Sequence, residues 1–409
     1  MSYQRNIKAR FEEALSTSPA VLLTGGRQKG KTTFVKEIGV EKGYHYVTFD
    51  DLSTLSAAKR DPKGFIEALP KPVIIDEVQR VPDIFFPIKK YIDSNRKPGI
   101  YILTGSANPL LINKVAESLV GRLETLTLYP LSQGELHDRK EDFITTAFNT
   151  EQLLLPENTI SKEELYKRMI VGGYPLVQPL SASRGDAWFR GYVRDILIKD
   201  VQDLSNIEGL SELPNLLKLI SYRAGHVLNV AELSRQFGLS AVTTHRYLAL
   251  LEALFMVYFC KPWRASAEKR LVKSPKVYMI DSGMVSFLQG MTVERLLAEP
   301  LFTGHILENF VWQELTKQAT WSNLYVDIYH FRTDTGVEVD IVLEDMMGRV
   351  VGIKLKNSDT VKGHDFKGLE YLQEKFGNKF VRGIIFYTGN DFVPFSKKLN
   401  ALPFSSLWR

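Results

Sequence analysis

A glycine-rich segment near the N-terminus has the spacing of a phosphate-binding loop. Residues 21–34 read VLLTGGRQKGKTTF and fit the pattern G-x-x-x-x-G-K-[ST] without a mismatch. Glycines let the backbone curl so that its N–H groups point at phosphate oxygens, and a following helix N-terminus adds positive potential. The segment therefore predicts a nucleotide site. The residues expected to contact the nucleotide are Gly25, Gly26, Arg27, Gln28, Lys29, Gly30, Lys31, Thr32 and Thr33.

The segment KPVIIDEVQ contains a second apolar run, which begins at Val73 and has the length of a buried strand. Two carboxylates, Asp76 and Glu77, stand at the end of this run. We expect Lys31 to reach the β and γ phosphates, and Thr32 and Asp76 to hold Mg²⁺. Glu77 is then placed to polarise the water that attacks the γ-phosphate. The expected nucleotide is ATP, because no N/T-K-x-D guanine-reading box is visible and NKVA at 113–116 lacks the aspartate.

Three further side chains are candidates for the catalytic set. The run GIYILTGSAN ends in Thr104 and Ser106, which would face the γ-phosphate if this strand lies in a parallel sheet with its ligand at the carboxyl ends. An ordinary strand-to-loop turn, which Gly105 alone could explain, is the alternative. Arg122 opens the alternating strand in SLVGRLETLTLYPLS and could stabilise charge on the transferring phosphoryl group, in cis or in trans.

The elements that must position these groups are visible around them. AVLLTG is an apolar run of strand length, and KTTFVKEIG continues it as a helix that we expect to end at Gly39. Strand, glycine loop and helix is the order that phosphate binding needs. Together with the two later strands, this order predicts an α/β fold built on a parallel sheet.

Composition sets wider bounds on the chain. At 409 residues it is long enough for two to four domains, and its apolar and charged fractions are those of a globular protein. A net charge of +5 permits an anionic partner without requiring one. Cys260 is the sole cysteine, so no internal disulfide can form. The most apolar stretch, residues 247–260, is too short to span a bilayer, and we expect a cytoplasmic protein without membrane contact.

The motifs LTGGRQKGKTT, VIIDEVQRVPDIFFPIKKYID, ILTGSANPLL, SLVGRLETLTLYPLS and GGYP occur in this order. This series resembles a group of prokaryotic AAA+ ATPases that carry a long uncharacterised C-terminal region. The resemblance implies an AAA+-type P-loop core, with Ser106 or Thr104 as the first sensor and Arg122 as the arginine finger. Gly26 and Lys29 depart from the family pattern, which often has proline and valine there. Neither change removes a phosphate-binding group.

The chain after the core predicts three more regions. We expect the ATPase core at 1–131, a helical lid and connector at 132–205, a winged helix at 206–285 and a restriction-endonuclease-like α/β domain at 286–409. In the third region, a short helix, a turn at Gly238 and a helix beginning near Ser240 precede a basic segment. The residues expected to contact double-stranded DNA are His245, Arg246, Lys269, Arg270 and Lys273. The alternative is a winged helix that binds proteins.

The last region resembles a restriction-endonuclease core in its order of elements. By position, Glu308 and Asp340 match metal ligands and Lys356 matches the active-site lysine, whereas Lys354 replaces the second strand carboxylate. Two oxygen ligands would hold Mg²⁺ poorly, so this resemblance implies a degenerate domain. One alternative is a domain that still contacts a phosphate backbone through its lysines. Another is a purely structural pairing of lysines with carboxylates.

These observations predict an Mg²⁺-dependent ATPase whose nucleotide state gates DNA binding by the C-terminal half. Two other functions stay open at this point. One is a nucleotide-dependent switch that acts through unknown protein partners, and the other is an ATP-regulated nuclease. AAA+ relatives often form rings, which makes a homo-oligomer one alternative, and the residues leave the oligomeric state open.

Overall fold

The computed structural model describes residues 3–106, 119, 121–149, 159–197, 212–263 and 274–408. The chain divides into two compact units. The N-terminal unit contains Arg5–Leu131 together with Leu250–Met256, and the C-terminal unit contains Met1–Gln4, Ser132–Ala249 and Val257–Arg409. No helix among the described residues is long and apolar enough to cross a membrane.

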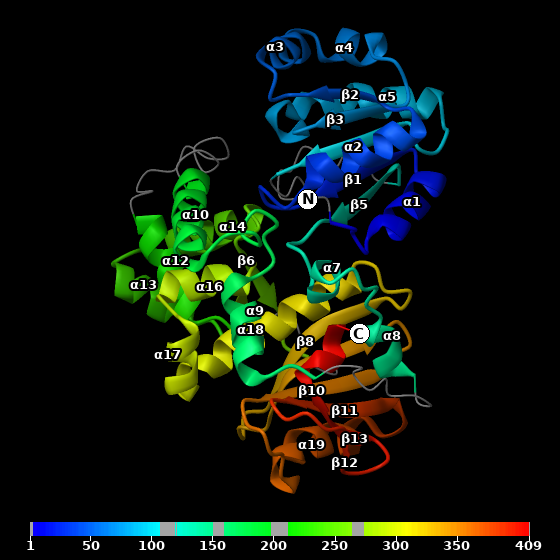
Figure 1. Ribbon diagram of the computed structural model, residues 1–409. Helices are drawn as coiled ribbons and strands as arrows, with labels where there is room; N and C mark the ends of the chain where they lie inside the picture. Colours follow the sequence, from blue (N-terminus) through cyan, green and yellow to red (C-terminus); the bar gives the residue numbers. More distant parts are fainter. Residues whose placement is uncertain are drawn as a thin grey trace. The chain divides into compact units, whose positions relative to one another are not determined.

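The N-terminal unit is built on a five-stranded sheet of order β2-β3-β4-β1-β5, in which the paired strands all run parallel (Figure 1). The central strands β1, β3 and β4 are buried at every position, which explains their unbroken apolar sequences. The strands are β1 (Ala20–Thr24), β2 (His45–Thr48), β3 (Val73–Asp76), β4 (Tyr101–Gly105) and β5 (Leu123–Thr127). The helices are α1 (Lys8–Thr17), α2 (Lys31–Lys42), α3 (Leu52–Arg60), α4 (Pro62–Ala68) and α5 (Phe85–Ser94).

Helix α2 continues past the predicted end at Gly39 and stops at Gly43, which has the left-handed φ of 71°. Gly39 is instead an interior helical position where the backbone approaches β3, because a Cβ there would lie 2.5 Å from the Ile74 side chain. The prediction of the helix end was wrong, since close packing rather than helix termination explains this glycine.

The C-terminal unit begins with helices and a small hairpin. The helices are α7 (Gln133–Leu136), α8 (Phe143–Phe148), α9 (Lys162–Val171), α10 (Ala182–Asp195), α12 (Leu213–Tyr222), α13 (Val230–Phe237), α14 (Ala241–Ala253, whose last four residues fall in the N-terminal unit), α16 (Ser282–Gln289), α17 (Val293–Ala298) and α18 (Pro300–Ala319). Strands β6 (Val257–Cys260) and β7 (Lys276–Met279) pair antiparallel. Helices α9 and α10, from the predicted lid, pack against α16 of the same unit.

The end of the chain forms a six-stranded mixed sheet of order β12-β13-β11-β10-β9-β8, with α19 (Lys367–Phe376) packed on β10 and β11 (Figure 1). Strands β8, β9 and β10 are antiparallel neighbours, whereas β10, β11 and β13 run parallel. The strands are β8 (Val326–Arg332), β9 (Glu338–Asp345), β10 (Val350–Lys356), β11 (Phe380–Tyr387), β12 (Val393–Pro394) and β13 (Leu399–Pro403). This α/β layer places charged residues of β9 and β10 near α18 and β7.

The GGYP turn is fixed by a buried carboxylate. Asp281 accepts hydrogen bonds from Gly173 N at 2.7 Å and from Met284 N at 3.2 Å, so it both closes the turn and caps α16. Gly172 has a φ of +70°, and a Cβ there would lie 2.1 Å from Asp281 Oδ1. Glycine is therefore required at position 172 by conformation and by space.

We expect Gly172→Ala to destabilise the protein by at least about 2 kcal/mol, because left-handed strain and the clash with Asp281 add together. The matched control is Gly191→Ala in α10, where no atom lies within 4 Å of the added Cβ and φ is not positive. That change should be neutral or stabilising by about 0.5–1 kcal/mol. Thermal unfolding of both variants provides the measurement. Equal melting temperatures would contradict the role of Gly172.

Candidate functional site

The glycine loop joins β1 to α2 in a conformation that needs its glycines. Gly25 and Gly30 have φ values of 138° and 90°, and a Cβ on Gly25 would lie 2.3 Å from the Leu128 carbonyl oxygen. The buried Lys31 donates from Nζ to the carbonyl oxygens of Gly25 and Gly26, at 2.8 and 3.0 Å. The loop therefore holds the Lys31 ammonium against its own carbonyl oxygens.

Asp76 accepts hydrogen bonds from three hydroxyl groups at the carboxyl end of β3. Its Oδ2 accepts from Thr32 Oγ1 at 3.0 Å and from Tyr46 Oη at 2.8 Å, and its Oδ1 accepts from Thr104 Oγ1. Burial, followed by the bond to Asp76, raises the pKa of Tyr46, so this phenol stays a donor. Thr32 and Asp76 thus meet as the sequence predicts, and a hydroxyl beside a carboxylate suits Mg²⁺, which is usually held by few protein oxygens.

Glu77 lies beside Thr104 and Ser106. Its Oε2 accepts hydrogen bonds from Ser106 Oγ at 2.9 Å and from the Gln79 amide, and its backbone N donates to Thr104 Oγ1 at 3.2 Å. Gln79 Nε2 also contacts Ser106 Oγ at 2.8 Å. Glu77 has a φ of 60°, a conformation that non-glycine residues adopt rarely and often at functional sites. This network places Thr104 and Ser106 beside the carboxylates of Asp76 and Glu77, and their catalytic role stays a prediction.

Besides Tyr46, two residues of this site were missed by the sequence analysis. Gln79 is one of them, and its only signal was the polar position two residues after Glu77. Arg5 is the other, and it donates to the carbonyl oxygens of Lys29 and Tyr129 at 2.9 and 2.7 Å. Arg5 therefore ties the glycine loop to the segment after β5, a contact that no local pattern indicates.

The remaining loop residues differ in exposure. Arg27, Gln28 and Thr33 are exposed, and Gly26 is buried. Lys29 is fully buried, with its Nζ 5.2 Å from the centre of the Phe255 ring. The side chain of Lys29 thus packs inside the unit, and a contact with nucleotide would have to come from its backbone.

Arg122 lies at the amino ends of the strands, whereas the glycine loop lies at their carboxyl ends. It immediately precedes β5, whose first residue Leu123 pairs with Ala20 at the start of β1, whereas the loop follows the end of β1. The five residues of β5 span about 16 Å. Arg122 also forms an ion pair with Asp93. This geometry contradicts an arginine finger acting in cis, and the trans role stays a prediction.

The C-terminal unit brings Glu308 and Asp340 together around a residue that the sequence analysis missed. Lys276 Nζ lies 2.8 Å from Glu308 Oε1 and 2.8 Å from Glu338 Oε1. Burial lowers the pKa of Lys276, but the carboxylates of Glu308, Asp340 and Glu338 outweigh it and raise the pKa overall. Burial raises the pKa of Glu308 to about 7, against the opposing effect of Lys276.

The two lysines of β10 lie apart from that ammonium. Lys354 Nζ donates to the Glu338 carbonyl oxygen at 3.2 Å, whereas Lys356 forms an ion pair with Asp365. Both line a cavity of about 460 Å³ together with His364 and Lys367. Within the described residues, no three His, Cys, Asp or Glu side chains form a group able to hold a metal ion.

The predicted DNA-contacting residues are only partly described. His245 and Arg246 are exposed on α14, after the turn at Gly238, which has a φ of 62°. Lys269, Arg270 and Lys273 lie outside the described residues. Three helices followed by an antiparallel hairpin are the elements that a winged helix needs, but that assignment stays a prediction.

Comparison with known proteins gives matches along most of the chain. Residues 17–137 match the family model described as AAA domain. Residues 162–295 and 303–407 match two models described as domains of unknown function, DUF8612 and DUF4143. An uncharacterized protein of Mycobacterium tuberculosis is 29% identical over 362 residues, which cover 87% of this chain and 74% of the relative. An uncharacterized protein of Methanocaldococcus jannaschii is 22% identical over 382 residues, covering 89% and 81%.

Two solved structures show a more distant likeness. A Walker-type ATPase of Pyrococcus abyssi has 15% identity and a TM-score of 0.38, over 70% of this chain and 96% of that one. The Holliday junction branch migration motor RuvB of Thermotoga maritima has 17% identity and a TM-score of 0.29, over 62% and 88%. The match at 17–137, the parallel sheet and the glycine loop together support a prokaryotic AAA-type P-loop ATPase.

Proposed function

We propose that the protein is an Mg²⁺-dependent ATPase whose nucleotide state gates DNA binding by its C-terminal half. The observation that carries the ATPase proposal is the hydrogen-bonded set at the carboxyl ends of β1, β3 and β4. Thr32, Asp76 and Thr104 are joined there through the Asp76 carboxylate, and Lys31 lies in the loop beside them. Parallel α/β sheets bind ligands at this edge.

Each residue has a distinct task in this proposal. The loop N–H groups and the Lys31 ammonium would bind the β and γ phosphates, and Thr32 and Asp76 would hold Mg²⁺. Bound Mg²⁺ would neutralise charge on the phosphate oxygens. Glu77 would orient and polarise the attacking water, and Ser106 with Gln79 would keep the Glu77 carboxylate turned toward that position.

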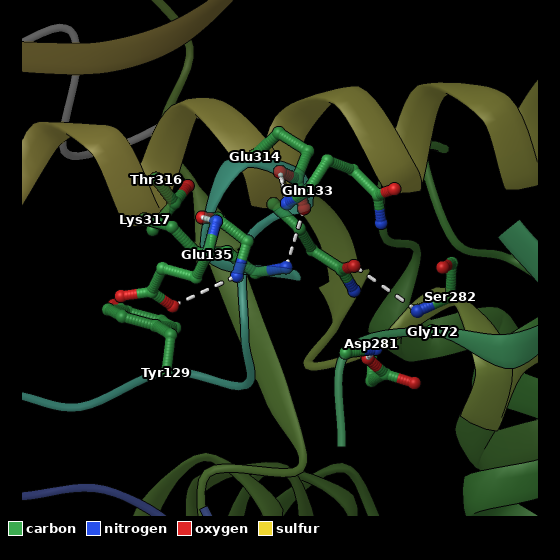
Figure 2. Close-up of polar contacts among 12 residues, drawn as sticks. Tyr129, Gln133, Glu135, Gly172, Asp281, Ser282, Glu314, Thr316 and Lys317 are labelled. Atoms are coloured by element: carbon green, nitrogen blue, oxygen red, sulfur yellow. Dashed lines mark hydrogen bonds and ion pairs between the residues drawn. The ribbon is translucent and has the colours of Figure 1, made fainter. Parts of the chain in front are cut away.

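A short connection offers a route from this site to the C-terminal unit. Leu128 N donates to Thr24 O at 2.8 Å, beside the loop, and five residues later the chain enters α7. There Glu314 of α18 accepts from Gln133 N at 2.8 Å and pairs with Lys317 at 2.6 Å (Figure 2). Helix α18 also carries Glu308, which contacts β7 through Lys276. A shift of the segment after β5 would therefore act on α18 and the elements bound to it.

The DNA part of the proposal rests on lysine, arginine and histidine side chains. Lys354, Lys356, His364 and Lys367 line one cavity, and His245 and Arg246 are exposed on α14. Lysines that neutralise phosphates give binding that weakens steeply with salt. Positive charge alone does not distinguish a nucleic-acid site from a site for an acidic protein. The experiment must therefore measure how DNA affects ATP hydrolysis and how ATP affects DNA binding.

We expect duplex DNA to stimulate steady-state ATP hydrolysis by the pure protein, with Glu77→Gln as the blank. Binding of a fluorescent duplex should respond to ATP and weaken with salt. Lys354→Gln combined with Lys367→Gln should weaken it further, at least about threefold. Lys397→Gln, at an exposed lysine outside the cavity lining, is the matched control. Hydrolysis at the same rate with and without duplex DNA, together with no binding of the fluorescent duplex, would contradict the gating proposal. This result would leave the ATPase proposal intact and favour a switch that acts on proteins.

A further inference from the structure

We infer that Tyr46 is a positioning residue of the metal site. Its hydroxyl fixes the Asp76 carboxylate in the orientation that Mg²⁺ needs, and Lys36 holds the phenol ring in place. This inference rests on the proposed ATPase, which assigns no task to Tyr46 or Lys36. It adds β2 to the strands β1, β3 and β4 that build the site.

The register of the sheet places Tyr46 level with the residue two positions before Asp76. Strands β2 and β3 run parallel, and Tyr46 pairs with Ile74. Because residues two apart share a face of a strand, Tyr46, Ile74 and Asp76 lie on one face of the sheet. Asp76 is about 7 Å further along the strand. The Tyr46 side chain spans this distance, since its Oη donates to Asp76 Oδ2 at 2.8 Å.

The two oxygens of Asp76 are fixed by separate hydroxyl groups. Oδ2 accepts from Tyr46 and Thr32, and Oδ1 accepts from Thr104. Thr32 is itself a proposed metal ligand, whereas Tyr46 and Thr104 bind the carboxylate without being ligands. One such donor on each oxygen opposes rotation of the carboxylate. Asp76 is only 2% exposed, so water cannot readily replace a donor that is lost.

Lys36 supports the phenol from α2. It lies four residues after Thr32, so the two side chains share one face of the helix. The Thr32 hydroxyl reaches Asp76, and the Lys36 ammonium lies 4.2 Å from the centre of the Tyr46 ring. An ammonium over an aromatic face is attracted to it. This face of α2 therefore acts on Asp76 twice, directly through Thr32 and indirectly through Tyr46.

The test measures metal binding rather than turnover. The full chain is saturated with an ATP analogue that cannot be hydrolysed, and free Mn²⁺ is followed by electron paramagnetic resonance. Tyr46→Phe keeps the ring and removes the donor. It should weaken Mn²⁺ binding at least about tenfold, because hydrogen-bond partners of metal-binding carboxylates typically have effects of this size. Its affinity for the analogue in EDTA should stay at the parental value, since Tyr46 makes its hydrogen bond to Asp76 and not to the glycine loop.

Two further variants serve as the control and as a test of Lys36. Tyr44→Phe is the matched control, because Tyr44 Oη donates to the Gly99 carbonyl oxygen at 2.6 Å and not to Asp76. It loses one hydroxyl hydrogen bond, as Tyr46→Phe does, but its Mn²⁺ binding should stay parental. Lys36→Met should weaken Mn²⁺ binding by about two- to fivefold. It should add nothing to Tyr46→Phe, because Lys36 acts through the hydroxyl that this variant lacks.

Two outcomes would overturn the inference and leave the ATPase proposal in place. One is Mn²⁺ binding by Tyr46→Phe as tight as that of the parent protein. The other is an equal loss of analogue affinity in EDTA, which would make Tyr46 a support of the loop rather than of the metal site. A parent protein that binds neither the analogue nor Mn²⁺ would contradict the proposed ATPase, and this inference with it. If Tyr46→Phe does not fold, parental Mn²⁺ binding by Lys36→Met would count against the inference.

Discussion

Replacing Glu77 with glutamine is expected to lower the turnover number for ATP by about 10²- to 10⁴-fold while ATP stays bound. The reason is that an amide cannot accept a proton from the attacking water, although it has nearly the shape of the carboxylate. The Lys31 loop and the Thr32–Asp76 pair do not depend on the Glu77 side chain, because their hydrogen bonds are made to other groups.

Single-turnover hydrolysis and equilibrium binding of ATP, measured on the same preparation, separate the two expected effects. Glu67→Gln is a suitable control, since Glu67 lies on α4 and its carboxylate is 3.9 Å from the Lys63 ammonium, outside the Glu77 network. Hydrolysis by Glu77→Gln at the parental rate would show that another group activates the water. Loss of ATP binding in this variant would show instead that Glu77 is needed to hold the loop.

The nucleotide site could be predicted because its determinants are local. The glycines of residues 25–30 predict the conformation of the loop backbone. Thr32 lies in the first turn of the helix that follows this loop, so its position is predicted with it. Asp76 could be placed beside Thr32 from sequence, because parallel strands end at a common edge. Gln79 could not, because its contact with Glu77 depends on the left-handed turn at Glu77 itself.

Arg122 illustrates a geometric signal that was present but not used. A residue that precedes a strand of a parallel sheet must lie at the edge away from the ligand, and β5 begins immediately after Arg122. Its position before the strand therefore already argued against action on the nucleotide of the same chain. The role of Arg122 as a finger in trans stays a prediction.

Lys276 illustrates a determinant that sequence order hides. Its partners Glu308 and Glu338 lie 32 and 62 residues further along the chain, on a helix and on a strand of another sheet. Nothing in the sequence around Lys276 distinguishes it from the neighbouring lysines of a basic segment. The prediction that Lys354 replaces a metal ligand came from the position where a strand carboxylate was expected, and it stays a prediction. The folded chain adds Lys276 as a cation paired with Glu308 and Glu338.

Lys31→Met is expected to abolish ATP binding, with at least a 100-fold rise in the dissociation constant, which corresponds to about 2.7 kcal/mol or more. The ammonium supplies the positive charge that meets the β and γ phosphates, and it also donates to the carbonyl oxygens of Gly25 and Gly26. Methionine keeps much of the side-chain volume and removes both the charge and the donors.

The control for this change is Lys42→Met, on the same helix. The Lys42 ammonium lies 3.7 Å from a carboxylate oxygen of Glu12, outside the glycine loop. Calorimetric titration with ATP and Mg²⁺ should therefore give near-parental binding for Lys42→Met and none for Lys31→Met. Melting temperatures without nucleotide separate loss of charge from loss of fold, since the two loop hydrogen bonds account for only about 1–3 kcal/mol. If Lys31→Met folds and still binds ATP at the parental affinity, the loop is not the phosphate site, and the ATPase proposal fails at its first step.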